Sequence, residues 1–170
     1  MAYTNYVKLK ETGDEGEQKF IEFLDQKGYQ NIQVIDDVYE EEGLLTSDWD
    51  VRATNDLGIV ITFEVKTQDR CHKFGWFNCE QVQNGKLGGI PVSKADYVVF
   101  YNPVLGFGIE EHKSFMKTHW EITKQASMID YKRKKQLTMR NGLEVILWKT
   151  DFTNWAAGWR QKNNTINWYK

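Results

Sequence analysis

Apolar residues near the start of the chain recur with the period of a helix. Phe20, Ile21 and Leu24 fall on one face of an ideal helix, and they predict an amphipathic helix over residues 13–27. Gly28 follows directly, as is common for the left-handed residue that ends a helix. Acidic residues crowd the first turn, where they complement the positive end of the helix dipole.

Further along, short apolar runs bounded by Asn, Asp, Gly and Pro predict strands. The Asn-Asp-Leu-Gly segment at 55–58 separates two such runs and predicts a hairpin. A second helix is predicted over 112–127, whereas residues 69–93, rich in Gly, Asn and Gln, are expected to be irregular. The predicted strands span residues 31–39, 44–54, 59–67, 95–103 and 142–149.

A helix, a hairpin and then alternating strands and helices predict an α/β fold with a central mixed β-sheet flanked by helices. The chain has 170 residues, 2 prolines and no linker-like stretch, so we expect a single domain over residues 1–170. The segment from 153 to 170 fits neither pattern clearly.

Charge and hydropathy exclude several classes of protein. The net charge of -2 argues against binding by bulk positive charge, although a local basic groove remains compatible with it. No run approaches the ~18 apolar residues of a membrane span. The first residues are polar and acidic, without the apolar core of a signal peptide. We therefore expect a cytoplasmic protein with no membrane partner.

Charged residues near the end of the third predicted strand give the first sign of chemistry. Side chains alternate between the faces of a strand, so Glu64 and Lys66 project together. Pairing through the predicted hairpin brings Asp50 close to Glu64, with Asp48 as the alternative if the register turns it inward. Converging carboxylates suit Mg²⁺ or Mn²⁺, which prefer hard oxygen ligands.

Glu17 lies on the apolar stripe of the first predicted helix. A buried carboxylate is costly unless something pairs with it. A metal ion or the Lys66 ammonium would supply that partner.

A helix Glu, a strand Asp and a Glu-x-Lys on the next strand resemble the PD-(D/E)xK phosphodiesterase superfamily, which has the restriction-endonuclease-like fold. GDEGEQKFIEFLDQKGY resembles the helix of its Holliday-junction-resolvase branch, and NCEQVQNGKLGGIPVSKADYVVFY resembles a segment of phage-type members. The resemblance covers roughly residues 13–101, and Trp49 stands where the superfamily's name has Pro.

The resemblance implies a Mg²⁺- or Mn²⁺-dependent endonuclease that hydrolyses DNA phosphodiesters, in the host cytoplasm if a phage encodes it. Asp50 and Glu64 would bind the metal with the Val65 carbonyl, and Lys66 would orient the attacking water or neutralise the phosphate. Glu17 would complete the catalytic set, and Glu80 would be an accessory residue. A homodimer, which would bring two sites to two strands, is left open.

Each sequence feature of the predicted nuclease site also has a simpler interpretation. A Glu-x-Lys on a strand is often a solvated ion pair, and an acid in a first helical turn often only complements the dipole. Their combination in the expected order favours the nuclease. The main alternative is a catalytically inactive nucleic-acid-binding accessory protein with the same fold. A third is an interaction module with neither metal nor nucleic-acid affinity.

Basic side chains are candidates for contacts with nucleic-acid phosphates, which position a duplex without reading its sequence. Their alternative is a solvated charge run, and Lys94 could extend the same track. The spacing of Cys71, His72 and Cys79 lacks the paired C-x2-C halves of structural zinc sites. His112 and His119 are interpreted as surface or interface residues. The predicted phosphate contacts are Arg70, Lys73, Lys132, Arg133, Lys134 and Lys135.

Overall fold

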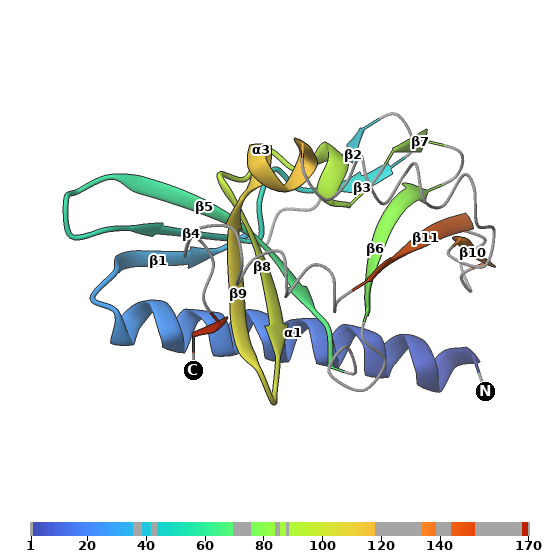
Figure 1. The fold of residues 1–170 in the computed structure, drawn as a ribbon, viewed down its shortest axis with the longest axis horizontal. Coiled ribbons are helices and arrows are strands. Elements are labelled where there is room, and N and C mark those ends of the chain that lie inside the picture. The colour runs from blue at the N-terminus through green and yellow to red at the C-terminus, as the bar shows by residue number, and fades with distance from the viewer. Residues whose placement is uncertain are drawn as a thin grey trace.

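The structure is a computed structural model, and it contains helices and strands in two larger sheets and one small hairpin (Figure 1). It describes residues 2–35, 39–41, 44–69, 76–83, 86–87, 89–117, 134–138, 144–151 and 168–169.

The elements follow one another along the chain in a mixed order. The helices are α1 (Ala2–Gln26), the 3-10 turn η1 (Ile90–Val92) and α3 (His112–Phe115). The strands are β1 (Gln30–Val34), β2 (Tyr39–Glu41), β3 (Leu44–Thr46), β4 (Val51–Thr54), β5 (Val60–Thr67), β6 (Trp76–Gln83), β7 (Lys86–Leu87), β8 (Tyr97–Asn102), β9 (Gly106–Glu111), β10 (Lys134–Thr138), β11 (Glu144–Asp151) and β12 (Trp168–Tyr169).

The main sheet has six strands in the order β1-β4-β5-β8-β9-β12. Only β5 and β8 run parallel, while the other neighbours are antiparallel. The prediction of an α/β fold with a mixed sheet is therefore confirmed. A second sheet has the order β10-β11-β6-β7, and β2 and β3 form a two-stranded sheet.

The predicted β4–β5 hairpin is confirmed, and its turn is built from local hydrogen bonds. Asn55 Oδ1 accepts from the backbone N–H groups of Leu57 and Ile59, at 3.0 and 2.9 Å. Gly58 takes a φ of 77°, which L side chains rarely adopt. The turn thereby fixes the register of β4 against β5.

Helix α1 covers one face of the main sheet (Figure 1), and aromatic side chains fill the contact. The ring of Phe20 meets that of Phe63 edge-on at 5.0 Å. On the opposite face, Phe115 of α3 lies 5.5 Å from Phe100 of β8. The buried residues that meet on the α1 face are Phe20, Phe23, Leu24, Val51, Ala53, Phe63, Val65, Val99, Tyr101 and Phe107.

Gly16 is the point of closest approach between α1 and β5. A Cβ added there would overlap Oγ1 of Thr67 and press on the ring of Tyr101 at 3.3 Å. A Cβ at Gly13, one turn earlier, would meet nothing within 4 Å. The absence of a side chain at Gly16 thus lets the helix lie close enough to the sheet to bring Glu17 to it.

Several boundaries differ from the sequence prediction. The first helix begins at Ala2 instead of Gly13, because the glycine costs it only about 1 kcal/mol and residues 2–12 contain no proline. The strand predicted over 31–39 ends at Val34, and β2 begins at Tyr39. The strand predicted over 44–54 is broken between β3 and β4, where the N–H of Lys94 bonds to the carbonyl of Asp48.

The prediction of irregular chain over 69–93 is wrong for β6 and β7. β6 pairs with β11, so its partner lies far away in the sequence, and local composition does not reveal it. β9 was also not predicted, although it directly follows β8 through a turn that Asn102 organises. The predicted strands at 95–103 and 142–149 correspond to β8 and β11.

The second helix was predicted over 112–127. It begins at His112 as expected, and α3 ends at Phe115. The predicted residues beyond 117 lie outside the described part of the chain. Among the described helices, none is both long and apolar enough to cross a membrane.

Candidate active site

Asp50 and Glu64 lie at the same end of the β4–β5 hairpin, as the sequence predicted, and both contact Lys66. Val51 pairs with Phe63; Asp50 directly precedes Val51, and Glu64 directly follows Phe63. The N–H of Asp50 donates to the carbonyl of Phe63 at 2.9 Å. Asp50 Oδ2 accepts from the N–H of Val65 at 2.7 Å. Backbone and side chain therefore both fix the Asp50 carboxylate beside β5.

Lys66 joins the two carboxylates. Its Nζ lies 2.5 Å from Oε1 of Glu64 and 3.7 Å from Oδ2 of Asp50. The side chains of Glu64 and Asp50 are only 7% and 16% exposed, whereas that of Lys66 is 33% exposed. The cluster is therefore buried on its acidic side and reaches solvent through the ammonium group.

Glu17 approaches this cluster from α1. Its burial, followed by the negative charge of Asp50, raises the pKa of Glu17 to about 7, while Lys66 acts in the opposite direction. Burial also raises the pKa of Asp50, against the stabilising effect of Lys66. Burial is the largest cause of both shifts, so the carboxyl groups of Glu17 and Asp50 lie in a poorly solvated place.

The donor chemistry of the cluster suits a hard divalent cation. Mg²⁺ usually takes one or two protein carboxylates and keeps several waters, and here Asp50 and Glu64 offer two. The N–H and C=O of a strand residue point the same way, so the Val65 carbonyl also faces the side on which Asp50 lies. Burial is the largest cause of the raised pKa of Glu17; the second cause is the negative charge of Asp50, which a cation would neutralise.

A metal site formed by three or more side chains was also sought among the described residues. In the part of the chain that the structure describes, no group of three or more His, Cys, Asp or Glu side chains is arranged to hold a metal ion. The residues that fit are thus a pair of carboxylates with a backbone carbonyl, and Glu17 stands nearby.

Asp48, the alternative ligand, lies elsewhere. Its Oδ1 forms an ion pair with Lys94 at 2.9 Å, and its backbone carbonyl accepts from the N–H of the same lysine. This double contact fastens the chain before β4 to the loop before β8. Lys94, suggested from sequence as part of a phosphate track, is thus held by Asp48.

The other candidates are only partly described. Lys134 and Lys135 belong to β10, opposite Trp148 and Leu147 of β11. Glu80 belongs to β6. His112 is half-buried, and its Nε2 lies 2.7 Å from the carbonyl oxygen of Ile90. The candidates outside the described residues are Arg70, Cys71, His72, Lys73, His119, Lys132 and Arg133.

Sequence reasoning missed Asp96, which lies just before β8. Its Oδ2 accepts from the N–H and the hydroxyl of Thr62, both at 2.9 Å. Thr62 shares its face of β5 with Glu64, and strand alternation predicted that much. The contact with Asp96 depends on the parallel pairing of β5 with β8, for which no local sequence signal exists.

Comparison with known proteins adds no relative to this description. No protein-family model, curated protein or solved structure matches the chain. Any functional argument therefore rests on the geometry and residue types of one cluster, which contains Glu17, Asp50, Glu64 and Lys66.

Proposed function

We propose that this chain is a divalent-metal-dependent endonuclease that hydrolyses DNA phosphodiester bonds on a restriction-endonuclease-like fold. The single observation that carries the proposal is the meeting of Asp50 and Glu64 around Lys66 at one end of the hairpin. Glu17 joins them from the covering helix. This is the set of residue types that the PD-(D/E)xK resemblance implies, gathered from two strands and one helix.

Asp50 and Glu64, with the Val65 carbonyl, would hold Mg²⁺ or Mn²⁺. Such an ion supplies charge stabilisation at the phosphoryl group and lowers the pKa of a water molecule. The hydrogen bond from Val65 keeps the Asp50 carboxylate in one orientation, so its remaining oxygen is presented in a fixed place. Preorganisation of this kind avoids reorganisation during the reaction.

Lys66 has two roles in this proposal. Without a cation, its ammonium compensates the two carboxylates that it contacts. With Asp50 and Glu64 holding a cation, Lys66 would be released towards its exposed side, where it would contact the phosphate of the substrate or orient the attacking water. Glu17 lies beside Asp50, and in its deprotonated form it would add negative charge that supports the binding of the cation.

The test uses purified protein, supercoiled plasmid and a branched DNA, each with Mg²⁺, with Mn²⁺ and with EDTA. Glu64→Gln should abolish cutting because it removes a charged ligand while keeping the shape of the side chain. Glu22→Gln, on the exposed side of α1, is the matched control and should cut like the wild type. If Glu64→Gln still cuts, or if EDTA has no effect, this assignment is wrong.

One observation favours a second function, a catalytically inactive nucleic-acid-binding protein with the same fold. The Lys66 ammonium already contacts Glu64 at 2.5 Å, in the place where a cation would bind this carboxylate. A binding protein of this kind would bind DNA in EDTA as well as in Mn²⁺, and Mn²⁺ would leave its melting temperature unchanged. The nuclease predicts a higher melting temperature in Mn²⁺.

A further inference from the structure

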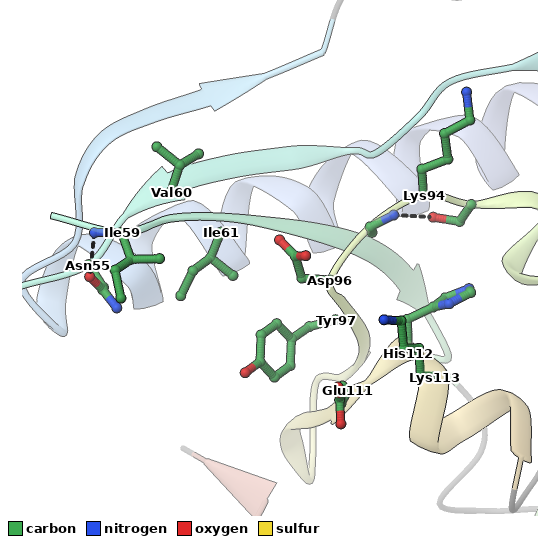
Figure 2. A pocket seen from close by; sticks show the side chains of 12 residues that line it. Asn55, Ile59, Val60, Ile61, Lys94, Asp96, Tyr97, Glu111, His112 and Lys113 are labelled. Atoms are coloured by element: carbon green, nitrogen blue, oxygen red, sulfur yellow. Dashed lines mark hydrogen bonds between the residues drawn. The ribbon is translucent and has the colours of Figure 1, made fainter. Parts of the chain in front are cut away.

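A pocket of about 600 Å³ opens beside the start of β5, between the β4–β5 hairpin and the first residues of α3 (Figure 2). Its size falls within the range of small-molecule sites. One wall is apolar and comes from the hairpin, with Ile59, Val60 and Ile61. The other comes from the loop before β8 and from the end of β9.

The polar groups of this pocket are held in place by the fold. Asp96 lines it, and its carboxylate is fixed by the two hydrogen bonds from Thr62. His112 is fixed by the carbonyl of Ile90. Figure 2 shows Asp96 close to Ile61 and Tyr97, while Lys94 extends away from them. The pocket therefore combines an oriented hydrogen-bond acceptor with an aromatic ring and an aliphatic wall.

The pocket lies close to the candidate active site on the same strand. Thr62, which holds Asp96, precedes Glu64 by two residues and projects from the same face of β5. Two residues of a strand span about 7 Å. A chain of nucleotides at the carboxylate cluster would therefore pass the mouth of the pocket. Lys113, exposed on the pocket wall, is available for a backbone phosphate.

We infer that this pocket receives an unpaired nucleobase of the substrate, one that carries an exocyclic amino group. A base in a duplex is stacked and paired, so it cannot enter, whereas an unpaired base can lie against aromatic and aliphatic side chains. Asp96 then accepts a hydrogen bond from the amino group, as carboxylates do from N4 of cytosine. The inference rests on the proposed nuclease function, and it makes single-stranded or branched DNA the substrate class.

The first measurement is the affinity for oligo-dC, oligo-dT and a fully paired duplex, by fluorescence anisotropy in EDTA so that no cutting occurs. The pocket predicts that oligo-dC binds about tenfold more tightly than oligo-dT, which has no amino group. Oligonucleotides of N4,N4-dimethyl-deoxycytidine, which lack both donor hydrogens, should bind like oligo-dT. This comparison uses the wild-type protein and so does not depend on how a variant folds.

Substitutions then test whether the preference for oligo-dC depends on the residues of the pocket. Asp96→Asn should bring the affinities for oligo-dC and oligo-dT together, since Thr62 keeps the amide oxygen as its acceptor and the NH2 group, a donor, then faces the base. Ile59→Ser should weaken both, while Leu57→Ser is the matched control. Both residues are exposed on the hairpin, at 54% and 77%, but only Ile59 lines the pocket. Equal affinity for oligo-dC and oligo-dT in the wild type, or equal effects of the two serine variants, would overturn the inference.

Cleavage assays on the same oligonucleotides separate this inference from the proposed function. Metal-dependent cutting without a base preference would contradict the nucleobase-binding role of the pocket and would support the nuclease function. If the protein never cuts but shows a base preference that Asp96→Asn removes, the nucleobase-binding role of the pocket is supported and the nuclease function is contradicted. A protein that neither binds nor cuts DNA would overturn both.

Discussion

The carboxylate of Asp50 is tied to the strand that carries its partner acid, because Oδ2 accepts a 2.7 Å hydrogen bond from the N–H of Val65. Val65 directly follows Glu64, so the two acids cannot separate without breaking this bond or the hairpin. The structural and chemical roles of Asp50 are therefore distinguishable by substitution.

Asp50→Asn and Asp50→Ala should both abolish cutting, yet they should differ in stability. Asn retains an oxygen that can accept from Val65, whereas Ala leaves a part-buried N–H without its partner. An unsatisfied buried donor costs about 1–3 kcal/mol. Urea unfolding should show that loss for Ala and much less for Asn. Equal stability of the two variants would mean that the hydrogen bond contributes little.

Gly16→Ala should destabilise the protein, whereas Gly13→Ala should stabilise it by up to about 1 kcal/mol through helix propensity. Both glycines lie in α1, but only the Cβ at Gly16 would overlap Thr67. Adding Thr67→Ala should recover part of the loss, because the obstructing hydroxyl is gone. The measurement is a double-mutant cycle of unfolding free energies. Additive effects would show that the two residues do not press on each other.

Glu17 should make the metal-free protein less stable as the pH rises from about 4.5 towards 7. Its pKa is raised from 4.5 to about 7 by burial and by Asp50, so the folded state holds a proton that the unfolded state has released. Glu17→Gln removes this penalty and should be the more stable protein above pH 7. Solvent screening reduces the difference to the order of 1 kcal/mol at this half-buried site.

The check is urea unfolding in EDTA at several pH values, with the exposed Glu15→Gln as control. The wild type and the Glu17→Gln variant should have equal stability near pH 4, and a growing difference should follow at higher pH. A difference that does not depend on pH would indicate a packing effect of the substitution instead.

Lys66→Met should strengthen the binding of Mn²⁺ while it weakens or abolishes cutting. The ammonium lies 2.5 Å from Glu64 and competes with any cation for that carboxylate. Its removal leaves two buried acids without their compensating charge, so the metal-free variant should also melt at a lower temperature. Isothermal titration calorimetry measures the affinity. Weaker Mn²⁺ binding by Lys66→Met would show that the cation does not use Glu64.

The sequence predicted the positions of those site residues that are determined by nearby segments of the chain. Strand alternation and a short turn place Asp50 and Glu64 together, and both signals lie within a few residues of the acids themselves. Asp96 escaped prediction because its position depends on pairing between β5 and β8. For the same reason β6 was expected to be irregular, since its partner β11 follows it at a long distance in the chain.

The mixed sheet has a consequence for the order in which the chain folds. β5 meets β4 through a tight turn, whereas its parallel partner β8 becomes available only after β6 and β7 have been synthesised. Closing a short loop costs less entropy than closing a long one, and chains fold from the N-terminus as they leave the ribosome. We expect α1 and the β4–β5 hairpin to associate on the nascent chain. The acids would then be assembled before β11, which completes the second sheet, has been made.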